Sequence, residues 1–407
     1  MKRFFCALLA ALSLLSLTAC GKTPEEQPEL DATLPPEIEE PVQKPEPESP
    51  PADPAAETVN ELLSSMSLAE KVGQLFFVRC PADHAVEDIS AYHLGGYILF
   101  GRDFQDANGS WLTKEQFTQT IQSYQDAASI SLLIGTDEEG GTVARASRNP
   151  NLFPDGKCKS PQALYQSDGW DGLATDTVEK TARLMELGIN VNLAPVCDVS
   201  TDPNDFIYNR SFGQDAESTA EYVKCIVRWV SWDRTIEGDH PGLVLKHFPG
   251  YGNNADTHTG IAVDERPMET FKTSDFLPFQ AGIEADSMGT VAVLVSHNIV
   301  QCMDPELPAS LSPAVHEILR RDLDFDGVVM TDDLAMDAVS AYAKDGAAAV
   351  MALEAGNDLV ITTDYRTQIP KVIEAVETGA LAEDMIDAAC RRVLTWKYHL
   401  GLLVDFS

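Results

Sequence analysis

The chain has 407 residues, a formal net charge of −35 and a hydrophobic fraction of 44%. That length is long for one ordinary domain but suits a decorated α/β barrel, and the hydrophobic fraction is that of a globular protein. The negative charge argues against nucleic acid as a partner and against membrane binding through a basic patch, because both of those surfaces are anionic.

The first twenty residues have the pattern of an export signal. Lys2 and Arg3 precede an apolar run over 4–17, which is too short and too one-sided for a membrane-spanning helix. The run closes with the letters LTAC, ending at Cys20, and these resemble the bacterial lipobox. The resemblance implies lipidation of the Cys20 thiol and an exported protein that is lipid-anchored at the outer face of the cell membrane. The alternative is a plain signal peptide in which Cys20 has no role.

Residues 21–57 are rich in Pro and Glu and contain almost no large apolar side chain. Such a segment cannot bury a core and should stay extended and solvated. We therefore predict a lipoprotein signal peptide over 1–20, a disordered linker over 21–57 and a single folded domain over 58–407. No run of 18 apolar residues follows the signal, so a lipid would be the only membrane anchor.

The cysteines do not indicate a metal site. Cys6 belongs to the signal, and the remaining cysteines after Cys20 are scattered without a C-x-x-C pair: Cys80, Cys158, Cys197, Cys225, Cys302 and Cys390. Zinc-site spacing is therefore absent, and we expect no metal. The spacing does not indicate any disulfide pairing, and buried thiols are the expectation.

Eight short segments rich in apolar and β-branched residues recur along the folded part, as expected of strands buried on both faces. They are QLFFVR (74–79), GGYILF (95–100), SLLIGTD (131–137), INVNLAPVCDV (189–199), GLVLKHF (242–248), TVAVLVSH (290–297), GVVMTDD (327–333) and GNDLVITT (356–363). Stretches with helical period lie between most of them, at 114–128, 177–188, 217–232 and 339–356, and further helices are expected at 55–73 and 383–403.

This alternation of eight strands with helices predicts a (β/α)8 TIM barrel. The alternative is an open, doubly wound sheet. The dinucleotide-binding form of that sheet is disfavoured, because no G-x-G-x-x-G or P-loop motif follows a predicted strand.

Polar residues follow the ends of the third to seventh predicted strands. In a barrel these strand ends meet at one mouth, where active sites lie. The residues expected there are Asp137, Glu139, Arg145, Asp198, Arg210, Lys246, His247, Asp256, His258, His297, Asp332 and Asp333. Any one of them could be a solvated loop residue, but convergence from separate strands indicates a site.

The residue types at this mouth suit carbohydrate chemistry. The chain has no G-x-S-x-G or H-E-x-x-H motif, so a serine nucleophile elbow and a zinc protease site are not indicated. Carboxylates accept hydrogen bonds from sugar hydroxyls, and Lys and Arg donate to them. Cleavage of a glycosidic bond needs a carboxylate for the developing positive charge and a proton donor for the leaving oxygen.

Five motifs occur in order along the domain: TDEEGGTVARAS, NRSFG, KHFPGYG, DTH and VVMTDDLAM. They resemble the β-N-acetylhexosaminidases of glycoside hydrolase family 3, and the resemblance covers residues 58–400. It implies a TIM barrel, in agreement with the strand count. It also implies a retaining exo-glycosidase that removes terminal β-linked N-acetylglucosamine from cell-wall or other glycans, without metal or organic cofactor. We expect a monomer.

The same resemblance implies roles for individual residues. Asp332 matches the nucleophile of the family, and Asp256 and His258 match the Asp–His dyad that serves as acid and base. Alternation along a strand shows only that Asp332 and Asp333 cannot both face the mouth, and the resemblance selects Asp332. The substrate-binding positions that it implies are Asp137, Arg145, Arg210, Lys246 and His247.

Two departures from the family pattern and three other functions stand beside this interpretation. Tyr251 replaces the usual His, and the loop from Gly252 to Asp256 is one residue shorter than the common form. A β-glucosidase-like specificity or a phosphorylase is open, because a His acid/base does not repel phosphate as a Glu does. A glycan-binding surface lipoprotein without turnover would be expected to lack the nucleophile or the dyad, and this chain retains both.

Overall fold

The computed structural model describes residues 54–232, 240–254, 260–336, 339, 342 and 347–403. The predicted signal peptide with Cys20, and the predicted dyad of Asp256 and His258, lie outside the described residues. The folded part begins before residue 58, where the predicted linker was to end. Residues 54–57 form the first turn of α1 (Pro54–Ser65). Ala55 in that turn is buried, which gives the turn a packing reason to be ordered.

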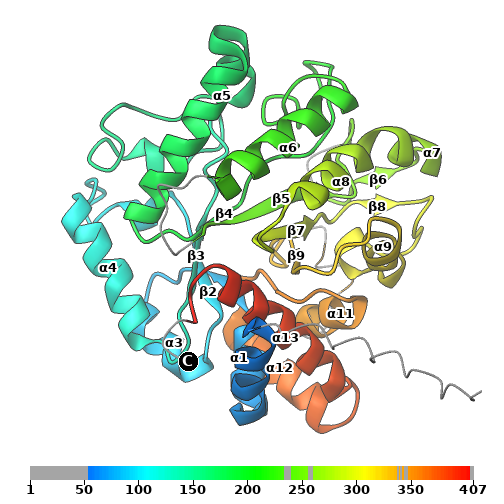
Figure 1. Cartoon of the computed structure of the whole chain (residues 1–407). Coiled ribbons are helices and arrows are strands. Elements are labelled where there is room, and N and C mark those ends of the chain that lie inside the picture. The colour runs from blue at the N-terminus through cyan, green and yellow to red at the C-terminus, as the bar shows by residue number, and fades with distance from the viewer. Residues whose placement is uncertain are drawn as a thin grey trace, which may run out of the picture. The chain divides into compact units, whose positions relative to one another are not determined.

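Seven strands form one parallel sheet in the order β1 (Phe77–Arg79), β2 (Gly96–Leu99), β3 (Leu133–Thr136), β4 (Val191–Asn192), β5 (Gly242–Phe248), β7 (Val291–Val295) and β9 (Val329–Thr331). The eighth predicted strand closes the ring through isolated bridges. Leu359 pairs with Met330 of β9, and Val360 pairs with Phe76 next to β1. The predicted (β/α)8 barrel is therefore confirmed, with its helices outside the strands (Figure 1).

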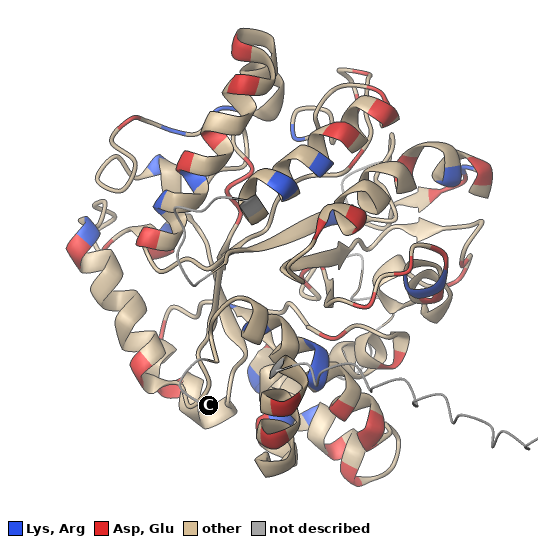
Figure 2. Cartoon of the chain, viewed as in Figure 1, with Lys and Arg blue, Asp and Glu red and all other residues tan. Residues whose placement is uncertain are grey.

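The helices after α1 are α2 (Leu68–Gln74), α3 (Ala85–Tyr92), α4 (Lys114–Ala127), α5 (Pro161–Glu186), α6 (Ala216–Trp232), α7 (Met268–Thr270), α8 (Phe276–Ala285), α9 (Pro313–Glu317), α11 (Ala348–Ala355), α12 (Tyr365–Glu377) and α13 (Glu383–His399). Shorter turns of 3-10 or π type are η1 (Gly101–Phe104), η2 (Ala146–Arg148), η3 (Phe271–Asp275), η4 (Ala309–Leu311) and η5 (Ile318–Asp322), and β6 (Val263–Asp264) pairs with β8 (Ile299–Val300) as a separate ribbon. Acidic residues lie on helices around the barrel, so the negative charge is not confined to one element (Figure 2).

Local sequence explains several of the element ends. Thr113 caps α4 and Ser160 caps α5, because the side-chain oxygen of each accepts a hydrogen bond from a backbone N–H of the first turn. Residues with a short hydroxyl side chain are favoured at this position. Gly356 ends α11 with φ of 109°, a left-handed conformation that glycine adopts without a steric cost. β4 is shorter than the predicted 189–199, although the chain still pairs with β5 beyond it, through an isolated bridge between Val196 and Lys246. Pro195, between β4 and this bridge, has no N–H to give to the strand ladder.

Alternating strand residues divide between the barrel interior and the helical layer. Val244 of β5 and Met330 of β9 belong to the same hydrophobic cluster as Phe77 of β1. Their neighbours Leu245 and Val329 belong to a second cluster with residues of α6 and α8. Side chains two positions apart share a face of a strand, so the residues that follow Val244 and Met330 by two positions also face the interior, at the mouth.

The structure bears on the expectation of buried thiols and on that of no membrane-spanning helix. Cys80, Cys197 and Cys390 are buried thiols as expected, but Cys302 is exposed on the turn after β8, so burial does not hold for every cysteine. None of the helices in the described ranges combines the length and the apolar character that a membrane span requires.

Candidate active site

Lys246 is the centre of the polar cluster at the carboxyl ends of the strands. It lies on β5, and its Nζ is 2.6 Å from Oδ1 of Asp137 and 2.7 Å from Oε1 of Glu139, both in the loop after β3. Burial works to lower the pKa of Lys246, but the two carboxylates outweigh it and raise that pKa above its ordinary value. Lys246 therefore stays charged, and its contact with Asp137 joins two of the residues that the strand ends led us to expect at the mouth.

Glu139 joins Lys246 to Arg210 of the loop after β4. Nε and Nη2 of Arg210 lie 3.0 and 2.8 Å from the two carboxylate oxygens of Glu139, which is the two-pronged geometry that guanidinium and carboxylate favour. Burial works to raise the pKa of Glu139, but the charges of Lys246 and Arg210 prevail and bring it to about 2. Glu139 is thus a permanent anion that fixes two cations.

His247 is held from both sides. Its Nε2 lies 3.1 Å from Nη2 of Arg210, and its Nδ1 lies 2.7 Å from Oδ2 of the buried Asp198. Because a guanidinium only donates, Nε2 accepts from Arg210 and Nδ1 donates to Asp198. The other oxygen of Asp198 accepts from the backbone N–H of Tyr251 at 2.7 Å, so one carboxylate fixes the ring and the start of the next loop.

Lys246 and His247 are consecutive residues, and yet their side chains reach the same cluster. Lys246 contacts Glu139, and His247 contacts Arg210, which is paired with Glu139. The pairing register between β5 and β7 shifts between Lys246 and Phe248. Such an irregularity re-aims side chains at a strand end, which explains why simple alternation does not separate these two residues.

The two aspartates after β9 have different surroundings. Asp332 lies two positions after the inward-facing Met330, so strand alternation places it, and not Asp333, on the interior face of the barrel. The carboxylate of Asp333 accepts from the backbone N–H of Ala335 at 3.0 Å in its own turn, and its carbonyl lies 3.0 Å from Nε2 of His297. Burial, with the nearby charge of Asp332, raises the pKa of Asp333. His297 is itself fully buried, and this contact with the carbonyl of Asp333 holds the turn in place.

Arg145 stands apart from the Lys246 cluster. Its backbone N–H donates to Glu138 at 3.0 Å, and its guanidinium carbon lies 5.6 Å from the centre of the Phe100 ring. Glu138 also accepts from the backbone and side chain of Ser147, and it therefore fixes the loop after β3 instead of facing the mouth.

The loop that carries the predicted dyad is described only at its ends, and those ends are anchored. Arg266 donates to Gly250 O at 3.2 Å, to Asp264 and to Asp275. Gly250 has φ of 123° and lies so close to Asp275 that a Cβ atom would clash with that carboxylate. Tyr251, at the position where the family usually has His, is buried with its ring centre 5.7 Å from that of His247. The roles predicted for Asp256 and His258 stay predictions.

Sequence reasoning placed Glu139 and Asp198 at the mouth but gave them no role, although each fixes a predicted binding residue. It did not consider Arg79, the last residue of β1 and the end of the letters QLFFVR. The signal was the same one that marked the other strands, a charged residue where an apolar run ends.

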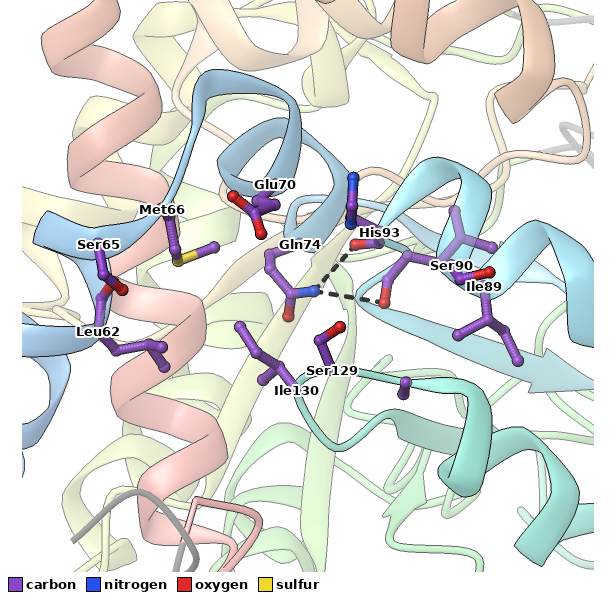
Figure 3. Close-up of a pocket in the computed structure, with 12 residues that line it drawn as sticks. Leu62, Ser65, Met66, Glu70, Gln74, Ile89, Ser90, His93, Ser129 and Ile130 are labelled. Atoms are coloured by element: carbon purple, nitrogen blue, oxygen red, sulfur yellow. Dashed lines mark hydrogen bonds between the residues drawn. The ribbon is translucent and has the colours of Figure 1, made fainter.

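A cavity of about 120 Å³ lies at the end of the barrel opposite to the mouth (Figure 3). Gln74, His93 and Ile130, which lie before β1, β2 and β3, are among its lining residues, and the amide of Gln74 donates to His93 O at 2.9 Å. The carboxylate of Glu70 in this lining is already the partner of the helix cap Ser67. This cavity therefore lacks the convergent charged groups of the mouth.

The closed parallel barrel, with carboxylates and paired cations gathered at its mouth, defines an α/β-barrel enzyme that acts on carbohydrates. Residues 67–396 match the family described as "Glycosyl hydrolase family 3 N terminal domain". The chain therefore belongs to glycoside hydrolase family 3 and is a glycoside hydrolase.

Relatives and solved structures agree with this assignment. The chain is 32% identical over 323 residues to the "Beta-hexosaminidase" of Stenotrophomonas maltophilia (strain K279a), covering 77% of this chain and 88% of that protein. A family 3 β-N-acetylglucosaminidase from Paenibacillus sp. str. FPU-7 is similar in structure, with a TM-score of 0.72 and 29% identity over 83% of this chain and 63% of that one. M. tuberculosis LpqI has a TM-score of 0.72 and 27% identity, covering 83% and 96% of the two chains.

Proposed function

We propose that the chain is a retaining exo-glycosidase that hydrolyses terminal β-linked N-acetylglucosamine from cell-wall or other glycans. The observation that carries this proposal is the inward-facing Met330, from which strand alternation directs Asp332 to the mouth that also holds Lys246, Arg210 and His247. The printed names of the relatives, a β-hexosaminidase and a β-N-acetylglucosaminidase, support the choice of sugar.

The proposed reaction has two displacements. Asp332 attacks the anomeric carbon while His258 protonates the leaving oxygen, and a glycosyl ester of Asp332 forms. His258 then takes a proton from water, and the resulting hydroxide displaces Asp332 and releases the sugar. Two inversions give net retention of configuration. Asp256 would hold the imidazole in the required tautomer.

Some N–H donors of Lys246 and Arg210 are not used in the described contacts and are available to bind the sugar. An ammonium group has three N–H donors, and Lys246 uses two of them on Asp137 and Glu139, so one remains for a hydroxyl. Arg210 directs Nε and Nη2 to Glu139 and His247, which leaves the two donors of Nη1. These donors support the substrate-binding roles proposed for Lys246 and Arg210, the latter on the N-acetyl side.

We further propose that the enzyme is exported and held at the outer face of the membrane by lipid on Cys20, with the Pro- and Glu-rich segment as spacer. The sequence pattern of 1–57 supports this location. Cell fractionation tests it: the full-length protein should sediment with membranes and its Cys20→Ala variant should not. Equal release of both proteins would contradict the anchor.

A panel of nitrophenyl sugars, assayed with and without inorganic phosphate, tests the proposed reaction. We expect release of N-acetylglucosamine from its β-glycoside in either buffer, with Asp332→Asn as the inactive control. Formation of a sugar 1-phosphate would show that the enzyme is a phosphorylase, and it would overturn the proposed hydrolysis. Preference for the glucoside over the N-acetylglucosaminide would overturn the proposed specificity.

A further inference from the structure

Four charged side chains form one layer across the inside of the barrel mouth. They are Arg79 at the end of β1, Asp137 after β3, Lys246 on β5 and Asp332 after β9. These strands alternate around the ring, and each strand of such a barrel is displaced by about one residue from the next, so alternate strands supply the residues of one interior layer.

The layer below supports this placement. Phe77, Gly135, Val244 and Met330 precede the four charged residues by two positions on the same strands. A Cβ atom on Gly135 would lie 2.5 Å from the ring of Phe77, so these two positions face each other across the barrel interior. The residues two positions later share that face, and Arg79 therefore points inward at the mouth.

Charges alternate around this layer. Arg79 comes between Asp332 and Asp137 in strand order, and Lys246 lies on the opposite side. Lys246 is fixed by two carboxylates within 2.7 Å, whereas Arg79 forms no hydrogen bond or ion pair through its guanidinium with any residue that the structure describes. Its Nε atom is buried without a partner.

Arg79 instead lies on an aromatic ring that it shares with Arg145. The guanidinium carbons of Arg79 and Arg145 are 4.4 and 5.6 Å from the centre of the Phe100 ring, and Nε of Arg145 is also buried without a partner. Stacking on a ring face leaves the N–H edge of a guanidinium free to bind a planar anion. Two cations held so near each other repel, and a bound anion would relieve that repulsion.

Among the described residues, no carboxylate forms an ion pair with Arg79. The charge of Arg79 acts to lower the pKa of Asp103 and Asp333, although burial dominates and raises both. Asp103 instead accepts from the backbone N–H of Phe100 at 2.7 Å, and Asp333 accepts from Ala335 in its own turn. Neither forms an ion pair with Arg79 within the described residues.

We propose that Arg79 and Arg145, stacked on Phe100, form a subsite for an anionic group carried by the sugar substrate, a carboxylate or a phosphate ester. This inference rests on the proposed function, because it places the anion on a glycoside bound against Asp332. It adds a substrate class: glycans whose sugars carry acidic groups are preferred over their neutral counterparts. The fork of each guanidinium suits two oxygens of such a group.

The test compares the wild type with Arg79→Gln and Arg79→Lys. Arg321→Gln is the matched control, because Arg321 is 66% exposed and pairs only with Glu317 and Asp322 among described residues. The kcat/KM is measured for a neutral β-N-acetylglucosaminide and for glycosides of the same sugar bearing a carboxylate or a phosphate ester. We expect Arg79→Gln to lose at least about tenfold more on one acidic glycoside than on the neutral one, as loss of a charge-assisted contact predicts. Arg79→Lys should recover part of that loss, and the control should match the wild type.

Small anions provide a second readout that does not need the variant to fold. Acetate and inorganic phosphate, at constant ionic strength, should compete with the neutral substrate of the wild type and raise its melting temperature. Equal losses on neutral and acidic glycosides, with no anion effect on the wild type, would overturn the subsite. Absence of any glycoside hydrolysis would instead overturn the proposed function, while anion binding to the folded protein would still report on the two arginines.

Discussion

Nζ of Lys246 lies 2.7 Å from Oε1 of Glu139, and Nη2 of Arg210 approaches the same oxygen at 2.8 Å. One buried carboxylate thus fixes two cations, one from β5 and one from the loop after β4. Glu139 therefore holds both cations in position at the mouth, and the cations are the groups that would contact the carbohydrate.

Glu139→Gln should weaken substrate binding and stability together. The substitution keeps the shape of the side chain but leaves two buried cations without their shared anion, and removal of one partner from a buried pair costs about 3–5 kcal/mol. We expect the free energy of unfolding to fall by a similar amount at neutral pH and KM to rise, as measured by denaturant unfolding and by steady-state kinetics. Glu317→Gln, at an exposed residue, is the control.

The pH dependence of this loss has a definite sign. Folding lowers the pKa of Glu139 from 4.5 to about 2, so its stabilising charge is fully present above pH 4.5 and is lost as the pH falls toward 2. The difference in unfolding free energy between wild type and Glu139→Gln should therefore stay constant from pH 5 to pH 8 and shrink below that range. A difference that disappears near neutral pH would contradict the assigned charge.

His258→Ala should affect substrates according to their leaving group. Nitrophenol needs little protonation, so formation of the glycosyl ester should stay comparatively fast. With an alkyl or sugar leaving group the rate should fall on the order of 10²–10⁴-fold, the usual contribution of general acid catalysis. Added azide should rescue turnover and give a glycosyl azide of retained configuration. Asp256→Asn should show a milder form, whereas an equal loss for all leaving groups without rescue would assign His258 to binding or packing.

Lys397→Met should stabilise the protein at low pH. Lys397 of α13 is fully buried, its Nζ donates to Oε1 of Gln74 at 2.7 Å, and burial lowers its pKa from 10.5 to about 7, only partly opposed by Cys390. The folded state therefore binds this proton less well than the unfolded state, and the stability of the wild type should rise as the pH increases from 7 to 10.5.

Melting temperatures of wild type and Lys397→Met from pH 6 to pH 10.5 provide the measurement. The variant removes the penalty of a buried charge but leaves the oxygen of Gln74 unpaired, which costs about 1–3 kcal/mol. We expect its relative stability to be greatest near pH 6 and to decline toward pH 10. A difference independent of pH would show that Lys397 does not titrate on folding.

Removal of 1–53 should leave a stable, active domain, whereas removal of 1–65 should destabilise it. The longer deletion removes α1, which packs on α13 and buries Val59 and Leu63. Each such apolar side chain contributes about 1.5–3 kcal/mol on burial. Thermal unfolding of the two truncated proteins distinguishes these outcomes, and equal stability would contradict a structural role for α1.

The barrel was predictable because its strands are apolar on both faces and are separated by stretches of helical period. The closing strand at 356–363 was recognised by the same pattern, although it joins the ring only through isolated bridges. The two-residue length of β4 was not predictable from apolar content, because hydrogen bonding past Pro195 depends on its neighbours in the sheet.

Individual site residues were harder to separate. Asp137, Glu138 and Glu139 are consecutive carboxylates, and only the fold directs Glu138 toward Ser147 and the other two toward Lys246. The sequence did carry a signal for Arg79, a charged residue where an apolar run ends, but its place in one layer with the other charged residues depends on the register of the strands. The motif resemblance supplied the other roles, and the packing around β9 supports its choice of Asp332.

Labelling of the nucleophile tests the central claim most directly. The wild-type enzyme is treated with a mechanism-based fluorinated N-acetylglucosamine analogue, digested and sequenced by mass spectrometry, with Asp332→Asn as a folded control that should have lost turnover. The proposed mechanism predicts one sugar ester, on Asp332, and none on the variant. A label on Asp333, or near-normal turnover by Asp332→Asn, would contradict it.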